Sequence, residues 1–188
     1  MTMETYYTTK REDWRQYLSE HYRTSPEIWF VFPMKASGEE SLSYNDAVEE
    51  ALCFGWIDST NRKLDELHCI RRFSPRNPGS TYSQPNIERL IWLDQRGMIL
   101  PEVRESVLPV IERPFLFPED IMAELRSDEA VWENYQNFSE PYKRIRIAYI
   151  EAARKRPGEF RKRLNSFMDK TRRNKLIMGY GGIEKYYR

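Results

Sequence analysis

The chain has 188 residues, of which 40% are hydrophobic and 31% charged, with a formal net charge of +1. This length fits one domain, or one domain with a small appendage, and can bury a core without disulfides or metals. No apolar run approaches the ~20 residues of a membrane span, and the N-terminus lacks the apolar stretch of a secretory signal. We therefore expect a cytoplasmic protein that does not span a membrane.

The near-zero net charge hides an asymmetry along the chain. Residues 1–142 contain 15 Lys and Arg against 25 Asp and Glu, whereas residues 143–188 contain 15 against 4. Such an imbalance is typical of a basic segment that binds nucleic acid or another acidic partner. It is equally typical of a basic segment that packs on the acidic part of its own chain.

The first half of the chain alternates between helical and strand patterns. Residues 10–22 are amphipathic and predict a helix, whereas the aromatic run of residues 27–34 is typical of a buried strand. Ser43 predicts the N-cap of a second helix, which ends near Gly55. Residues 56–74 predict two strands joined by a turn. These elements indicate a small mixed α/β unit with short strands, and we expect Trp29 and Trp56 in its core.

A loop rich in Pro, Ser and Asn spans residues 74–86. Pro85 then opens a predicted helix that ends before Gly97, and residues 100–112 predict another short helix. Three further prolines follow at positions 109, 114 and 118. We place a domain boundary there, with an α/β domain at residues 1–115 and a basic helical domain at residues 116–188. The fold class is therefore α+β.

The C-terminal domain has a helical pattern throughout. Residues 117–138 predict two short helices, the second capped by Ser127. A longer helix begins after Ser139, and its expected apolar face contains Ile145, Ala148, Tyr149 and Ala152. Pro157 begins the last helix, whose expected inward residues are Phe160, Leu164, Phe167 and Met168.

Two blocks of sequence, together with WFVFPMK at residues 29–35, carry a family resemblance. The first block is EEALCFGWIDSTNRKLD followed by RRFSPRNPGSTYSQPNIERLIWLDQRGM, and the second is NFSEPYKRIRIAYIEAARKRPGEFRKRLNSFMDKTRRNKL. The chain resembles the bacteriocin-protection family, also called YdeI-like or OmpD-associated (OmdA), over nearly its whole length. Tyr82 stands where that family usually has Trp. The resemblance implies a role in resistance to bacteriocins or cationic antimicrobial peptides and implies no established enzyme activity.

Metal and nucleophile chemistry find little support in the sequence. The histidines, His21 and His68, are far apart, and neither has close ligand spacing with Cys53 or Cys69. A zinc site needs three or four convergent ligands, so we expect no metal and no cofactor, and both cysteines as free thiols. No GxSxG motif is present, and we assign no catalytic residue.

The candidate ligand site surrounds Asp58. Strand alternation puts Trp56, Asp58 and Thr60 on one face, and a carboxylate beside a buried tryptophan needs a cationic partner. One interpretation is a polar cleft with Asp58 and Arg76 at its floor. The other is a structural network of ion pairs that fixes the loop. The candidate residues are Trp56, Asp58, Arg71, Arg72, Arg76, Ser80, Tyr82, Ser83 and Asn86.

Three functions follow as hypotheses. The first is a non-enzymatic binding or stress-protection protein that recognises a small anionic or polar ligand in this cleft. The second is a nucleic-acid or polyanion binder that uses the basic helices, with Arg161, Lys162, Arg172 and Arg173 as contacts; a solvated, self-neutralised face is the simpler interpretation of those helices. The third is an enzyme that uses the polar cleft. The sequence favours the first.

Overall fold

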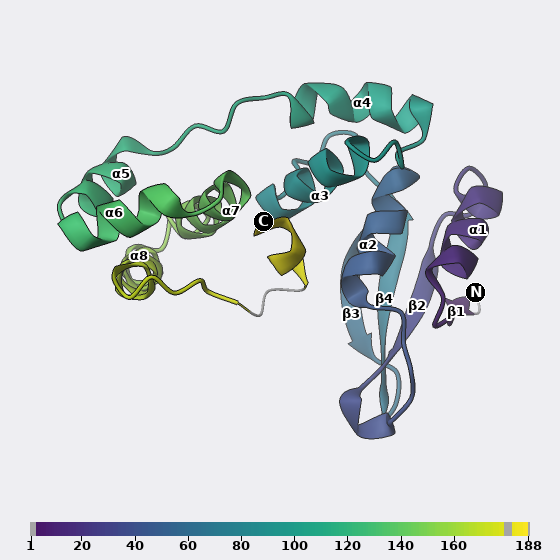
Figure 1. The fold of residues 1–188 in the computed structure, drawn as a ribbon. Helices are drawn as coiled ribbons and strands as arrows, with labels where there is room; N and C mark the ends of the chain where they lie inside the picture. Colours follow the sequence, from purple (N-terminus) through teal and green to yellow (C-terminus); the bar gives the residue numbers. More distant parts are fainter. Residues whose placement is uncertain (1–2, 179–181, 188) are drawn as a thin grey trace. The chain divides into compact units, whose positions relative to one another are not determined.

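The computed structural model describes residues 3–178 and 182–187 and shows an α+β protein. Figure 1 draws the fold with colours that follow the residue numbers. The chain divides into two units. The first contains Met1–Tyr82 and Leu90–Pro109, and the second contains Ser83–Arg89 and Val110–Arg188. The chain therefore passes into the second unit, returns to the first, and passes into the second again. The last of these crossings lies between Pro109 and Val110, and the boundary predicted between residues 115 and 116 follows it in the chain.

The first unit contains a four-stranded sheet in the order β1-β2-β4-β3. Its strands are β1 (Thr5–Tyr6), β2 (Ile28–Pro33), β3 (Trp56–Lys63) and β4 (His68–Pro75). Strand β1 runs parallel to β2, while β4 is antiparallel to both β2 and β3. The three longer strands confirm the prediction from the sequence. The two-residue β1 was not predicted, because it is too short to show a strand pattern.

An irregularity in β3 limits how far simple alternation applies. Asp58 is opposite Phe73 and Asn61 is opposite Arg71, so three steps along β3 match two steps along β4. Such an extra residue is a β-bulge, and it reverses the alternation of the residues that follow. Alternation therefore holds from Trp56 to Asp58 and cannot be extended to Thr60.

Helices α1 (Arg11–His21) and α2 (Tyr44–Cys53) pack on this sheet around Trp14. The Trp14 ring lies 5.0 Å from that of Phe30 in β2 and 5.5 Å from that of Phe73 in β4. Its Nε1 donates to the carbonyl oxygen of Ala47 in α2 at 3.0 Å. One buried indole thus joins both helices to the sheet. Trp29 and Trp56 are 5% and 1% exposed, which confirms both as core residues.

The predicted ends of α2 are confirmed. The Ser43 hydroxyl accepts a hydrogen bond from the backbone N–H of Asp46 at 3.0 Å and so caps the helix. Gly55, at φ +72°, follows the C-terminus in the left-handed region that favours glycine. Helix α3 (Gln84–Asp94) and helix α4 (Pro101–Ile111) also form close to their predicted positions. A short 3₁₀ turn, η1 (Lys35–Ser37), follows β2.

The second unit is helical. It contains α5 (Glu119–Arg126), α6 (Glu129–Asn137), α7 (Glu140–Glu151), α8 (Pro157–Arg172) and the 3₁₀ segment η2 (Ile183–Tyr187), together with the first turns of α3. Its core contains the rings of Tyr142 and Phe167, whose centroids are 6.2 Å apart. No helix of the described residues is long and apolar enough to cross a membrane.

Two predictions about these helices were wrong. Ser127 does not cap α6; the capping residue is Asp128, whose carboxylate accepts from the backbone N–H of Val131 at 3.0 Å, while Ser127 ends α5. The expected apolar face of α7 is also not its buried face. Tyr149 is 40% exposed and Ala152 is exposed. The buried residues of α7 are Tyr142, Lys143, Ile145, Arg146, Ile147 and Ile150.

Candidate functional site

The predicted site residues of the first unit separate into local pairs, and the sheet register explains how. Asp58 is opposite Phe73, so its side chain shares a face with Phe73 and with Arg71 two residues away. The Asp58 carboxylate accepts from Arg71 Nη1 at 2.7 Å and from the Tyr44 hydroxyl at 2.9 Å. The ion-pair partner of Asp58 is thus Arg71. Trp56 is buried, and its Nε1 donates to the carbonyl oxygen of Tyr22 at 3.0 Å.

Arg72 lies on the opposite face of the sheet. It is opposite Trp29, and Glu27 is two residues from Trp29 on that same face. Arg72 Nε donates to Glu27 at 2.7 Å, and the other carboxylate oxygen accepts from Trp29 Nε1 at 3.0 Å. The hydrogen bond from Arg72 is the main reason that the pKa of Glu27 lies below its ordinary value. This pair is separate from Asp58.

Arg76 makes contacts within its own loop. It donates to the carbonyl oxygen of Ser80, and its guanidinium lies 3.5 Å from the centroid of the Tyr82 ring. Burial raises the pKa of Tyr82. The structure thus brings Arg76, Ser80 and Tyr82 together. The polar cleft with both Asp58 and Arg76 at its floor stays a prediction.

Ser83 and Asn86 belong to the second unit, where they begin α3. The Ser83 carbonyl oxygen accepts from the backbone N–H groups of Asn86 and Ile87, both at 3.0 Å. The Asn86 side chain accepts from Arg89 Nη1 at 2.9 Å. Glu88 in the same turn binds Arg144 of α7 through two hydrogen bonds of 2.6 and 2.8 Å. This ion pair fixes the start of α3 against α7.

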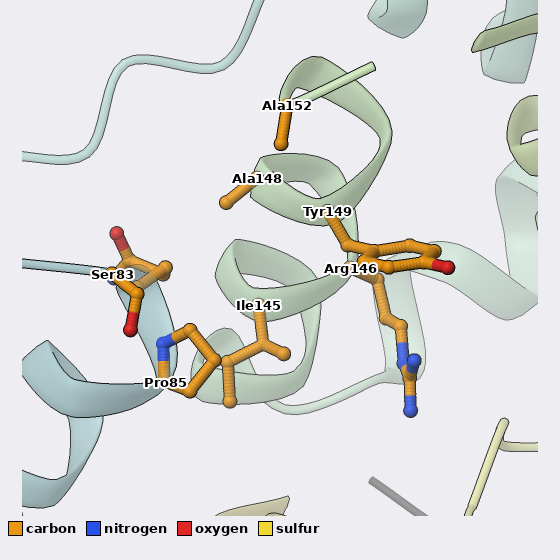
Figure 2. A pocket seen from close by; sticks show the side chains of 8 residues that line it. Ser83, Pro85, Ile145, Arg146, Ala148, Tyr149 and Ala152 are labelled. Atoms are coloured by element: carbon orange, nitrogen blue, oxygen red, sulfur yellow. The ribbon is translucent and has the colours of Figure 1, made fainter. Parts of the chain in front are cut away.

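An apolar pocket of about 240 Å³ lies where the start of α3 meets α7. Figure 2 shows Ala148 and Ala152 on the side of α7 that faces Ser83 and Pro85, with Ile145 close to Pro85. Arg146 and Tyr149 also line this pocket. Ser83 is therefore the one predicted ligand-binding residue that lines a described pocket. Ala148, Tyr149 and Ala152, which the sequence assigned to the apolar face of this helix, line this pocket together with the buried Ile145.

A second pocket, which we call the basic pocket, lies between α7, α8 and the segment that follows α8. Its volume is about 320 Å³, and its walls include Arg146, Tyr149, Lys162, Arg163, Ser166 and Ile177. The carboxylate residue Glu159 also lines this pocket. Arg163 donates to it at 2.7 Å, and this bond is the main reason that the pKa of Glu159 is lowered. Because Glu159 is neutralised in this way, Arg146 and Lys162 leave the pocket with an excess of positive charge.

Arg146 is the most unusual residue of this region. It is 5% exposed, yet among the described residues it has no carboxylate partner. Its Nη2 donates to the Ile177 carbonyl oxygen and to the Tyr187 hydroxyl, and the guanidinium lies 5.5 Å from the centroid of the Tyr142 ring and 5.8 Å from that of Tyr187. Among the described residues, its buried Nε has no hydrogen-bond partner. No described carboxylate therefore compensates the charge of this guanidinium.

Sequence reasoning missed Arg146 because it sits in a run of basic residues that resembles a solvated face. The available signal was its position between Ile145 and Ile147, both of which are buried. An arginine flanked by two buried isoleucines on a helix cannot belong to a wholly exposed surface.

Two of the four residues predicted to contact a polyanion are held in ion pairs. Arg161 donates to Glu124 at 2.6 Å, and Arg172 donates to Asp128 at 2.8 Å and to Asp169 at 2.8 Å. These pairs support the self-neutralised interpretation for that part of the surface.

The other two, Lys162 and Arg173, are exposed and line a third pocket of about 430 Å³ along α8. Lys162 also lines the basic pocket.

Cys53 is a buried free thiol whose pKa is raised to about 12, chiefly by burial. That environment opposes a role for Cys53 as a nucleophile.

The fold and these pockets define a two-unit α+β protein whose helical unit contains two neighbouring pockets beside a buried arginine. The chain belongs to the family described as Domain of unknown function (DUF8412), which matches residues 6–106. Residues 114–174 match the family described as Bacteriocin-protection, YdeI or OmpD-Associated (OmdA). The FGWID and RFSPR blocks lie within the first match, and most of the basic helical block lies within the second. Comparison with curated proteins and with solved structures gave no match.

Proposed function

We propose that this protein is a non-enzymatic binding protein of the bacteriocin-protection type, and that its second unit binds an anion in the basic pocket. The observation that carries the proposal is Arg146, a buried guanidinium that has neither a carboxylate partner nor an acceptor for its Nε in the part of the chain that the structure describes. The pocket lies within the match to the bacteriocin-protection family apart from Ile177 and Met178.

The physical argument is one of charge compensation. A buried charge without a paired counter-ion is costly, even where aromatic rings offset part of the cost. An anion in the basic pocket would neutralise Arg146 and accept hydrogen bonds from it, and charge-assisted bonds of this kind are the strong ones. Lys162 supplies a second positive charge and Ser166 a hydroxyl donor at the same pocket.

The Asp58 region is a weaker candidate for the same role. Arg71 and Arg72 already bind the carboxylates of Asp58 and Glu27, so an incoming anion would have to displace a protein carboxylate. Arg146 has no such competitor among the described residues. We therefore propose that the small anionic ligand, which the sequence predicted near Asp58 in the first unit, binds in the second unit.

Titration of the full chain with inorganic phosphate, followed by backbone NMR, tests the proposal. We expect saturable shifts of residues in α7 and α8. Lys162→Gln should weaken phosphate binding by roughly tenfold, since a hydrogen bond to a charged group contributes about 1.5–3 kcal/mol. Lys155→Gln is the matched control, because Lys155 is exposed and lines none of the described pockets.

Arg146→Lys provides the second arm. It keeps the positive charge but loses the planar guanidinium and its Nε–H, so we expect weaker phosphate binding with the fold retained. If phosphate leaves α7 and α8 unshifted, or if the Lys162 and Lys155 variants bind it equally well, the proposal is overturned.

A further inference from the structure

The apolar pocket adjoins the basic pocket through shared walls. Arg146 and Tyr149 line both. The Tyr149 ring is held in place by Arg163, whose guanidinium lies 3.8 Å from its centroid and whose Nη1 donates to the Tyr149 carbonyl oxygen at 2.7 Å. A molecule that occupied both pockets would meet apolar walls in one and an excess of positive charge in the other.

The remaining walls of the apolar pocket are short side chains on a fixed frame. Ala148 and Ala152 leave space on the side of α7 that faces the start of α3, where Pro85 also lines the pocket (Figure 2). The two hydrogen bonds between Glu88 and Arg144 hold these elements together. A pocket framed in this way keeps its shape when empty, which is a common property of small-molecule sites.

We infer that the ligand of the basic pocket is a compact amphipathic anion, in which a ring-sized apolar group is attached directly to a phosphate or carboxylate. This inference rests on the proposed function, since it takes Arg146 as the anion-binding group. An apolar cavity of about 150 Å³ is large enough to bind benzene, so the present pocket of about 240 Å³ accepts one ring with a substituent. The anionic group lies in the basic pocket and the ring lies over Ala148 and Ala152.

The test compares inorganic phosphate with phenyl phosphate, using the full chain and calorimetry or NMR titration. We expect phenyl phosphate to bind about tenfold more tightly, because part of one ring leaves water. Ala152→Phe fills the apolar pocket from its exposed rim and should remove that advantage, leaving the affinity for phosphate within about twofold. Ala130→Phe is the control, an exposed alanine of α6 that lines none of the described pockets.

The outcomes separate this inference from the proposed function. If phosphate binds as proposed but phenyl phosphate binds no more tightly, the inference is overturned and the anion site stands. The same conclusion follows if Ala152→Phe keeps the full advantage of phenyl phosphate. If phosphate does not bind at all, the proposed function itself fails. Ala148→Leu, a smaller filling of the same pocket, replaces Ala152→Phe if that variant does not fold.

Discussion

Glu88 and Arg144 form an ion pair with two hydrogen bonds inside the second unit. Arg144 Nε lies 2.6 Å from Glu88 Oε1, and Arg144 Nη2 lies 2.8 Å from Glu88 Oε2. Glu88 is 2% exposed and also accepts from Gln84 Nε2 at 2.8 Å. The pair joins the first turns of α3, which are distant in sequence, to α7. It therefore stabilises the helical unit and frames the apolar pocket.

Removing Arg144 should be costly. Arg144→Met leaves the Glu88 carboxylate buried without its cation, and breaking a buried ion pair in this way costs about 3–5 kcal/mol. The double variant Glu88→Gln with Arg144→Met should recover much of the loss. The measurement is the free energy of unfolding in urea.

A matched control for this prediction is Arg154→Met. Arg154 pairs with Asp120 at the surface, and exposed pairs contribute about 0–1 kcal/mol. Equal effects of the Arg144 and Arg154 substitutions would contradict the structural role given to Glu88.

The arginines around Asp58 should differ in their effect on stability. Arg71→Ala removes the cationic partner of the Asp58 carboxylate, whose side chain is 12% exposed, while the Tyr44 hydroxyl still donates to it. This loss should cost about 1–3 kcal/mol. Arg76→Ala removes contacts within one loop and should cost less than about 1 kcal/mol. Thermal unfolding of both variants measures these two losses of stability. A larger loss for Arg76→Ala would restore the predicted pairing of Arg76 with Asp58.

The tip of the β3–β4 hairpin should depend on pH through His68. Its Nδ1 lies 2.8 Å from Asp65 Oδ1 and its Nε2 lies 3.0 Å from Glu39 Oε1. The hydrogen bond to Asp65 is the main cause that raises the pKa of His68, so its contribution to stability is complete below the ordinary histidine value. That contribution is lost as the pH rises through the raised value.

Asp65 sets the acid limit of this effect. Its pKa is lowered, chiefly by the backbone N–H of Leu67, so its contribution is present above the ordinary aspartate value and is lost as the pH falls through the lowered one. The hairpin tip should therefore be most stable between the ordinary pKa values of aspartate and histidine, and should lose stability as the pH passes through either shifted value. NMR titration of the His68 imidazole measures this directly, with His68→Gln to assign the signal. A His68 pKa at or below about 6.5 would refute the prediction.

Nucleic-acid binding through the basic helices should be weak, and its affinity should depend only slightly on salt. Because Arg161 and Arg172 are engaged by carboxylates, few cations remain to release counter-ions from phosphates, and the dependence of affinity on salt should be shallow. Fluorescence anisotropy with a single-stranded oligonucleotide measures both quantities. Tight binding at about 0.15 M salt that Lys162→Glu with Arg173→Glu abolishes would favour a polyanion binder instead.

The sequence predicted features that depend on local chemistry. Ser43 and Gly55 bound α2 as expected, because a capping hydroxyl and a left-handed glycine act within a few residues. Where two neighbours have equal chemistry, sequence cannot choose: Ser127 and Asp128 can both cap a helix, and the capping residue is Asp128. The fold class and the longer strands were predictable on the same local grounds.

The site depended on contacts that the sequence does not contain. Arg71, Arg72 and Arg76 were equivalent candidates for Asp58 until the register of β3 against β4 put only Arg71 beside it on the same face. Arg146 was hidden because burial of a basic residue depends on α8 and on the segment around Ile177 and Tyr187, which approach α7 only in the folded chain.

The double passage of the chain between its units matters for anyone who wishes to express the helical part alone. A fragment that begins at residue 116, where the composition changes, would contain all of α5 to α8 but would lack Glu88 and Pro85. Arg144 would lose its buried counter-charge, and the apolar pocket would lose the wall that α3 provides. Such a fragment would need residues 83–89 supplied as a separate peptide or grafted through a linker, so binding studies should begin with the intact chain.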